Sequence, residues 1–161
     1  MKRSASYALV GALVVLAALA SDCSGSGEPC CELHQVVRVV DGDTIEVEGG
    51  QSVRYLGIDT PEVSHPTKGL ECYGPEATEK NRKLVEGQQV RLEKDVTDKD
   101  KYGRLLRYVY VDGLFVNGEL VRLGYAYSSW YPPDTKYQML LTDLERVAKD
   151  NDRGLWATCE P

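Results

Sequence analysis

The sequence predicts an α+β fold that is mainly β: a small, partly open barrel of five strands with three helices. Five short segments alternate in polarity or are rich in β-branched residues, and turn signals separate them. Three longer segments carry apolar residues at the 3.6-residue spacing of a helix. With helices after the third and fifth strands, this order is compatible with a barrel that presents one face to an oligonucleotide or a sugar.

The N-terminal part of the chain is expected to lie outside this barrel. Residues 1–20 are predicted to be a secretory signal peptide, because a basic pair precedes an apolar run that ends in an A-x-A cleavage site. The run, residues 8–20, is shorter than the roughly 20 residues of a membrane-spanning helix. Residues 21–33 begin with a Ser-, Gly- and Pro-rich stretch and predict a flexible tether, which leaves residues 34–159 as the folded domain.

Two other fates of this segment stay open. It could persist as an uncleaved membrane anchor, or Cys23 could be lipidated and tether the domain to a membrane. Asp22 directly before Cys23 fits lipidation poorly. We therefore expect an exported protein, secreted or held in the cell envelope.

The strands and helices can be placed by their local signals. The expected strands cover residues 35–40, 44–48, 51–58, 88–94 and 104–111, and Gly49-Gly50 makes a tight reversal between the second and third. Pro75 is well placed as the first residue of a helix that stops at Gly87. Two further helices are predicted over residues 116–124 and 135–151.

Charge and cysteine content limit the possible functions. The chain has 19 basic and 25 acidic residues, and loss of Lys2 and Arg3 with the signal peptide would leave a net charge of −8. Such a protein cannot rely on bulk electrostatics to bind nucleic acid, so any phosphate site must be local. In an oxidising compartment disulfides are expected, and five cysteines leave one that is free, lipidated or paired between chains.

Acidic oxygens gather where the second and third strands are expected to meet. Asp41 and Asp43 lie at the head of the second strand, and Asp59 and Thr60 are expected at the end of the third. If these strands pair, Asp43 and Asp59 face each other. Two carboxylates with a backbone carbonyl and water suit a hard divalent cation. The plain alternative is an ordinary turn, in which Asp and Gly are common.

Two arginines, a glutamate and a tyrosine are further candidates for a phosphate or nucleotide site. Arg54 shares a strand with Asp59, and Arg104 begins the fifth strand; a guanidinium offers paired donors to phosphate oxygens. Glu62 follows Pro61, and near a cation and a phosphate it could act as a general base. Tyr131 is a candidate for stacking on a base. Each could equally be an ordinary surface or core residue.

Five motifs together resemble the staphylococcal nuclease (thermonuclease) family from about residue 36 to residue 156. In order along the chain they are VVDGDTIEV, VRYLGIDTPE, HPTKGLECYGPEA, DKYGRLLRYVYVDG and VNGELVRLGYA. The resemblance implies a five-stranded OB-fold barrel with three helices. It also implies a secreted Ca²⁺-dependent phosphodiesterase that cuts DNA and RNA and leaves 3′-phosphate ends.

The resemblance also implies roles for individual residues. Asp43 and Asp59 match carboxylates that bind one Ca²⁺, and Thr60 matches a residue that gives its backbone carbonyl. Arg54 and Arg104 match the arginines on the scissile phosphate. The remaining matches are Glu62 as the candidate general base, Asp41 as a nearby acid, Lys101 and Tyr102 in the nucleotide pocket, and Cys72 bridged to Cys159.

Two other functions remain open. The domain could be a non-catalytic OB-fold module that binds single-stranded nucleic acid, or an envelope lipoprotein with a structural calcium site. The presence of every candidate catalytic residue favours the nuclease. We expect a monomer without an obligate protein partner, because no long apolar stripe is left over.

Overall fold

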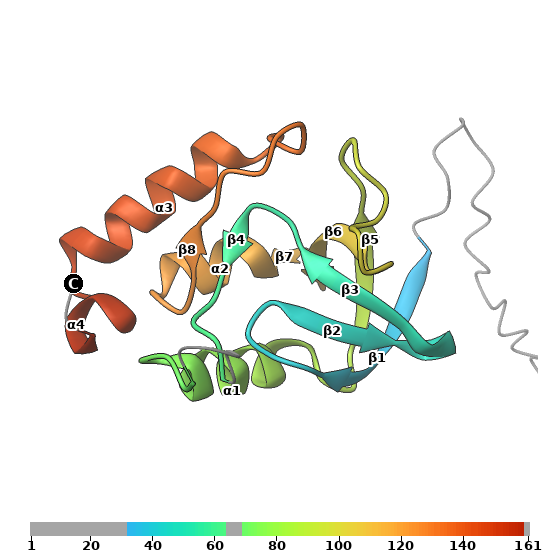
Figure 1. Cartoon of the computed structure of the whole chain (residues 1–161), viewed down its shortest axis with the longest axis horizontal. Coiled ribbons are helices and arrows are strands. Elements are labelled where there is room, and N and C mark those ends of the chain that lie inside the picture. The colour runs from blue at the N-terminus through green and yellow to red at the C-terminus, as the bar shows by residue number, and fades with distance from the viewer. Residues whose placement is uncertain (1–31, 64–68, 160–161) are drawn as a thin grey trace, which may run out of the picture. The chain divides into compact units, whose positions relative to one another are not determined.

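A computed structural model describes residues 32–63 and 69–159 of the chain (Figure 1). The expected signal peptide, Cys23 and most of the expected tether lie outside the described residues. The first strand begins at Leu33, one residue before the expected start of the domain. Within the described ranges, no helix combines the length and the apolar character needed to cross a membrane.

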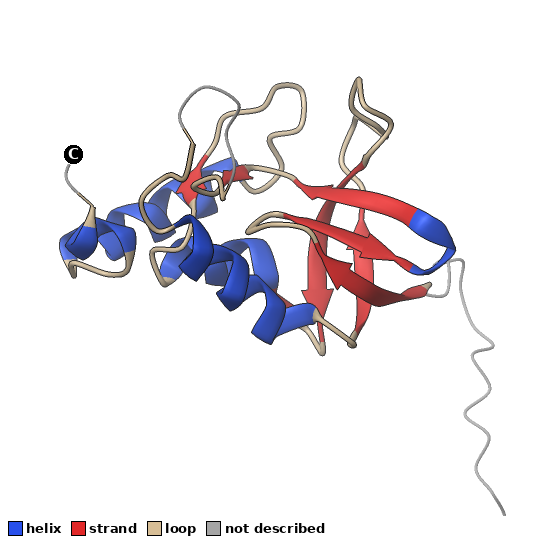
Figure 2. Cartoon of the chain, turned by 60° about the horizontal axis from the view of Figure 1, so that its bottom comes forward, coloured by secondary structure: helices blue, strands red, loops and turns tan. Residues whose placement is uncertain are grey.

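Five strands form a closed barrel, which confirms the predicted fold class. In spatial order they are β3 (Gln51–Tyr55), β2 (Thr44–Val47), β1 (Leu33–Val39), β5 (Gln89–Glu93) and β6 (Leu105–Val111). A parallel pairing of β3 with β6 closes the sheet, and the other neighbours in this series are antiparallel. Figure 2 shows these strands crossing one another, with helices along one side.

The register of β2 and β3 sets up the site. Thr44 pairs with Arg54 and Val47 pairs with Gln51, across a turn at Glu48–Gly50 in which both glycines have positive φ. Ile45 and Val53 point inward and are fully buried. Because side chains alternate along a strand, Arg54 then points away from this barrel interior.

The third strand is shorter than expected, so the prediction that Asp59 and Thr60 end it is wrong. The strand stops at Tyr55, and the chain turns at Leu56-Gly57 before a separate strand, β4 (Ile58–Asp59). Gly57 has φ +73°, and a Cβ there would lie 2.6 Å from Leu141 Cδ1. The positive φ of Gly57 redirects the chain, so β4 does not continue β3 but pairs with β8 (Tyr127–Ser128).

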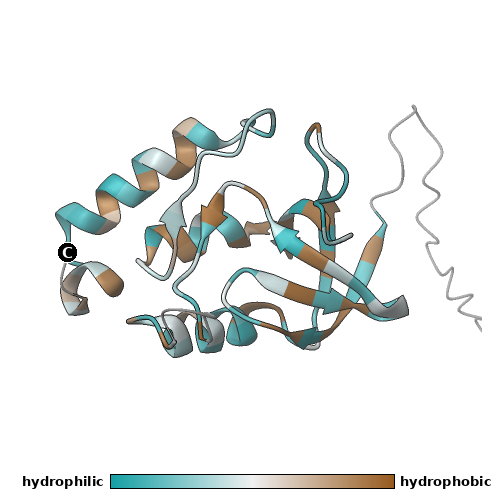
Figure 3. Cartoon of the chain, in the orientation of Figure 1, coloured by the Kyte–Doolittle hydropathy of each residue, from teal (hydrophilic) through white to brown (hydrophobic). Residues whose placement is uncertain are grey.

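The three predicted helices are present, and a short fourth follows them. They are α1 (Gly74–Val85), α2 (Val116–Arg122), α3 (Gln138–Asp150) and α4 (Leu155–Thr158). A short strand, β7 (Leu114–Phe115), pairs with β6 just before α2. In Figure 3 apolar and polar positions alternate along α3, and within it Leu141 and Ala148 are buried.

Buried polar side chains fix the turns around the barrel. Asn117, on α2, is fully buried; its Oδ1 accepts a hydrogen bond from Val109 N–H at 2.9 Å, and its Nδ2 donates to Leu56 O at 2.9 Å. This side chain therefore connects β6 to the turn that directs the chain into β4. The residues after that turn carry the predicted acids.

Candidate functional site

The loop between β1 and β2 packs closely on Thr60. Asp43 is 5% exposed, and its Oδ2 accepts hydrogen bonds from Thr60 N–H at 2.9 Å and from Thr60 Oγ1 at 3.0 Å. A Cβ on Gly42 would lie 2.6 Å from Thr60 Oγ1. Glycine is therefore required between Asp41 and Asp43 for this contact, which explains the DGD sequence better than turn formation alone.

Arg54 joins the two predicted metal-binding carboxylates. Its Nη2 donates to Asp59 Oδ1 at 2.8 Å, and its Nη1 lies 3.1 Å from Asp43 Oδ2. Nη1 also donates to the carbonyl oxygens of Tyr55 and Ile58, at 2.9 and 3.0 Å. Asp43 and Asp59 thus both contact Arg54. The turn after β3 brings Asp59 to this position, whereas the sequence had suggested that Asp43 and Asp59 face each other on paired strands.

Asp41 lies behind this pair and is held by α1. Its Oδ1 accepts a hydrogen bond from Asp43 N–H at 3.0 Å. Asn81, fully buried on α1, donates from Nδ2 to Asp41 O at 3.0 Å and accepts from Tyr55 Oη at 3.0 Å. Sequence reasoning gave Asn81 no role. Its place four residues after Ala77 and four before Val85, at helical spacing, was the available signal.

Burial and neighbouring carboxylates raise the pKa values of Asp43 and Glu62. Burial, with the nearby charges of Asp41 and Asp59, raises the pKa of Asp43 to about 7, although Arg54 acts in the opposite direction. Partial burial, followed by the Asp41 and Asp59 carboxylates, also raises the pKa of Glu62. The cluster therefore holds more negative charge than Arg54 alone can balance.

The side chains and carbonyl expected to bind a metal ion all offer oxygen atoms, the ligand type that a hard cation prefers. Across residues 32–63 and 69–159, no group of three or more His, Cys, Asp or Glu side chains is arranged to hold a metal ion. The expected set is smaller, with two carboxylates and the Thr60 carbonyl. All are oxygen donors, as Ca²⁺ prefers, and the uncompensated charge at buried Asp43 is what a bound cation would relieve.

Arg104 reaches the same pocket from the loop before β6. Its Nε donates to Asp100 Oδ2 at 2.7 Å, and Asp100 Oδ1 accepts from the backbone N–H groups of Tyr102 and Arg104 at 2.9 and 3.0 Å. Arg54, Arg104, Asp100 and Tyr131 all line one pocket. The role of Asp100 was missed, although an acid four residues before Arg104 in a turn was a signal for it.

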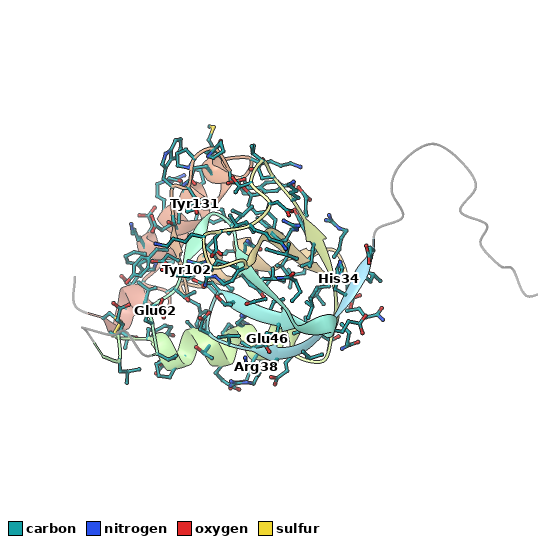
Figure 4. The ribbon with its side chains drawn as sticks, turned by 45° about the vertical axis from the view of Figure 1, so that its right-hand side comes forward. His34, Arg38, Glu46, Glu62, Tyr102 and Tyr131 are labelled. Atoms are coloured by element: carbon teal, nitrogen blue, oxygen red, sulfur yellow. A yellow bond between two sulfur atoms is a disulfide. The ribbon has the colours of Figure 1, made fainter. Side chains whose placement is uncertain are left out.

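The aromatic candidates lie along this side of the domain. Figure 4 shows Tyr131, Tyr102 and Glu62 on one side and His34 on the other. Tyr102 is 73% exposed, with Lys101 Nζ 5.0 Å and Arg104 Cζ 5.6 Å from its ring centroid, and Tyr131 is 46% exposed. Exposed rings beside two arginines can stack on bases.

Glu62 is placed by residues that lie further along the chain. Its backbone N–H donates to Glu71 Oε2 at 3.0 Å, and Glu71 N–H donates to Glu62 O at 2.9 Å. The neighbour of Glu71, Cys72, forms a disulfide with Cys159, which is the pair that the resemblance implied. Sequence reasoning did not single out Glu71. Its place directly before a cysteine, in the loop that follows β4 and contains Glu62, was the available signal.

Comparison with known proteins identifies relatives of this chain. The family model described as "Staphylococcal nuclease homologue" matches residues 52–158, which is more than half of the chain. The thermonuclease of Staphylococcus intermedius is 39% identical over 128 residues, covering 78% of this chain and 76% of that protein. The thermonuclease of Staphylococcus hyicus is 36% identical over 129 residues, with the same coverage of both chains.

A further relative comes from another genus. Endonuclease YncB of Bacillus subtilis (strain 168) is 42% identical over 125 residues, which is 74% of this chain and 59% of that protein. The range of the family model includes all four helices and the residues Arg54, Asp59, Glu62 and Arg104, and β1 and β2 precede its first residue. This chain belongs to the staphylococcal nuclease family.

Proposed function

We propose that this protein is a nuclease, more specifically an exported, Ca²⁺-dependent phosphodiesterase that hydrolyses DNA and RNA to 3′-phosphate ends. The observation that carries the proposal is the position of Arg54. Its guanidinium contacts both Asp43 and Asp59, and it lines the same pocket as Arg104. The arrangement brings anionic oxygens for a cation and cationic groups for a phosphate into one place.

One Ca²⁺ ion would be held by the carboxylates of Asp43 and Asp59 and by the backbone carbonyl of Thr60, with Asp41 behind them. Water and a substrate oxygen would complete its coordination, because Ca²⁺ takes six to eight oxygen ligands. When bound, the ion would polarise a phosphoryl oxygen and offset charge at the phosphate.

Arg54 and Arg104 would bind the phosphate from two sides. Each guanidinium offers paired N–H donors that match two phosphate oxygens. As charge grows on the phosphoryl oxygens in the transition state, donors that are already in position stabilise it without reorganisation. The hydrogen bonds that hold both arginines in place supply this preorganisation.

Glu62 would take a proton from the attacking water. Its pKa is raised by partial burial and by the Asp41 and Asp59 carboxylates, and a higher pKa makes a carboxylate a better base near neutral pH. Lys101, Tyr102 and Tyr131 would contact the nucleotide that carries the phosphate. With an acidic protein around the site, we expect a short substrate footprint and a shallow salt dependence.

One assay separates the nuclease from the other two functions. The mature domain is incubated with single- and double-stranded DNA and with RNA, first with Ca²⁺ and then with excess chelator, and the ends are identified by mass spectrometry. Calcium-dependent cleavage to 3′-phosphate ends is expected. Binding without cleavage would instead indicate an OB-fold binding module, and calcium-dependent melting without cleavage a structural calcium site. Intact mass of the exported protein would show whether Cys23 is lipidated.

A further inference from the structure

We propose that Glu71, held in place by the Cys72–Cys159 disulfide, is a positioning residue for Glu62. The inference rests on the proposed function, because it concerns the placement of the candidate general base. The Glu71 carboxylate and the Cys72–Cys159 disulfide would determine where Glu62 lies without touching the substrate.

The first support is a reciprocal pair of hydrogen bonds. Glu62 N–H donates to the Glu71 side chain at Oε2, and Glu71 N–H donates to the Glu62 carbonyl. The two residues are nine apart in sequence, so this pair fixes two distant points of the loop to each other. A single bond would leave Glu62 free to pivot, whereas two bonds on the same residue fix both its peptide groups.

The second support is close packing of Glu62 on the start of α1. Gly74 N–H donates to Glu71 O at 3.1 Å, so the chain turns between these residues. A Cβ on Gly74 would lie 2.7 Å from Glu62 O and 3.1 Å from Pro61 O. The backbone of Glu62 is therefore enclosed between Glu71 and the first residue of α1.

The third support is the covalent link to the end of α4, a short helix with one buried residue. Cys72 bridges Cys159, 87 residues later, directly after α4. Leu155 on α4 is buried, and its N–H donates to Gly124 O at 2.9 Å. Because α4 is anchored to the core, the disulfide prevents residues 71–72 from moving away from the domain together with Glu62.

Position matters here because a general base must lie within hydrogen-bond reach of the proton that it takes. A displacement of about 1 Å can lower turnover by about 100-fold. If Glu71 positions Glu62, its loss should lower kcat, while KM for the nucleic acid stays nearly constant, since Glu71 is not among the residues proposed to bind the substrate.

The experiment compares Glu71→Ala with Glu71→Gln. Both remove the charge of Glu71, but glutamine keeps an oxygen that can accept from Glu62 N–H. We expect Glu71→Ala to lower kcat by about 10- to 100-fold and Glu71→Gln to retain most of the activity. Glu48→Ala, an exposed acid in the turn between β2 and β3, is the matched control and should leave kcat unchanged.

Amide hydrogen exchange of the calcium-free protein gives a readout that is independent of cleavage. Glu71→Ala should raise the exchange rate of the Glu62 amide, and the paired change Cys72→Ser with Cys159→Ser should raise those of both Glu62 and Glu71. Amides in the barrel strands should keep their protection. The paired change also avoids a free cysteine that could form a new disulfide.

The outcomes separate the two proposals. If wild-type protein cuts no nucleic acid, the proposed nuclease fails, while the exchange data still show whether Glu71 holds Glu62. If wild type is active and Glu71→Ala changes neither kcat nor exchange at Glu62, the positioning role is wrong. Equal loss of kcat in Glu71→Ala and Glu71→Gln would also overturn it, because charge and not the hydrogen bond would then be responsible.

Discussion

Arg54 and Arg104 reach the same pocket but depend on different kinds of structure. Arg54 comes from a barrel strand, its side chain is 18% exposed, and it contacts two carboxylates and two backbone carbonyls. Arg104 precedes β6, is 31% exposed, and pairs with Asp100 in its own loop. One arginine is thus integrated into the barrel, and the other belongs to a locally stabilised turn.

The acid partners of the two arginines differ in the same way. Burial raises the pKa of Asp43, because Arg54 compensates its charge only in part. Although burial alone would raise it, hydrogen bonds from the Arg104 side chain and from the N–H groups of Arg104 and Tyr102 lower the pKa of Asp100. The ionised form of Asp43 in the barrel is therefore unfavourable, whereas the ionised form of Asp100 is stabilised by hydrogen bonds within its own loop. An unfavourable charge beside a proposed cation site is consistent with a site that is completed by a ligand.

The largest expected effect is the loss of either arginine. Arg54→Ala and Arg104→Ala should each lower kcat by about 10²–10³, because each removes a preorganised donor from the phosphate. Their effects on folding should differ. Arg54→Ala leaves buried Asp43 without its counter-charge and should lower the free energy of unfolding by about 3 kcal/mol. Single-turnover cleavage and urea unfolding of both variants measure the two effects.

Arg104→Ala should change the free energy of unfolding by about 1 kcal/mol or less, since its ion pair is partly exposed. Arg38→Ala is a suitable control, because Arg38 pairs with Glu46 on the outer surface of the barrel (Figure 4). Equal destabilisation by Arg54→Ala and Arg104→Ala would show that the barrel and the loop hold their arginines equally strongly.

The opposite pKa shifts predict opposite pH dependences for the calcium-free protein. The folded-state pKa of Asp43, about 7, lies above its ordinary value of 3.8, so the folded state keeps a proton that the unfolded chain has lost. Its contribution to stability therefore falls as pH rises from 3.8 to about 7, by on the order of 1 kcal/mol per pH unit at most. Asp100 has a lowered pKa, so its contribution is present above 3.8 and is lost as pH falls through its folded-state pKa.

Urea unfolding in the presence of a chelator, repeated across a series of pH values, tests the pH dependence of stability predicted for Asp43 and for Asp100. Asp43→Asn should flatten the decline between pH 3.8 and about 7, and Asp100→Asn should reduce the loss of stability at lower pH. A wild-type protein that gains stability through the upper range, with Asp43→Asn unchanged from it, would contradict the raised pKa.

The sequence was sufficient for the barrel because its strands have strong local signals. Alternation at residues 44–48 and the Gly49-Gly50 reversal predicted β2 and its pairing with β3, although not the register of that pairing. The bend at Gly57 was not predicted, since a single glycine in an apolar run does not show whether the chain continues straight. That bend depends on close contact with Leu141 of α3, about 80 residues away, which no local pattern reveals.

The sequence indicated the candidate side chains of the site but not the residues that hold them in place. Asp43, Arg54 and Asp59 stood out because charged residues at strand ends are visible in a sequence. Glu71 and Asn81 did not, because their hydrogen bonds to Glu62 and Asp41 depend on tertiary packing. The resemblance supplied the cysteine pair, which the number of cysteines alone left open.

A further prediction concerns Asp134, which anchors the loop that carries Arg104. Asp134 is fully buried, and its Oδ1 accepts hydrogen bonds from the N–H groups of Val96 and Thr97 at 2.9 and 2.7 Å. These residues begin the loop that leads to Arg104. Asp134→Ala leaves both N–H groups without this partner and should lower the free energy of unfolding by about 2 kcal/mol.

Asp134→Asn tests whether the hydrogen bonds or the charge of Asp134 carry this effect. Asparagine keeps one acceptor for the two amides, so it should be less destabilising than alanine. Asp150→Ala, an exposed acid on α3, is the control. If the loop is held mainly through Asp134, Asp134→Ala should displace Arg104 and therefore raise KM for DNA. Arg54→Ala should then lower the free energy of unfolding by the same amount in the Asp134→Ala variant as in the wild-type protein. Non-additive stability effects of these two substitutions would show instead that the barrel and the loop are coupled, because independent sites add.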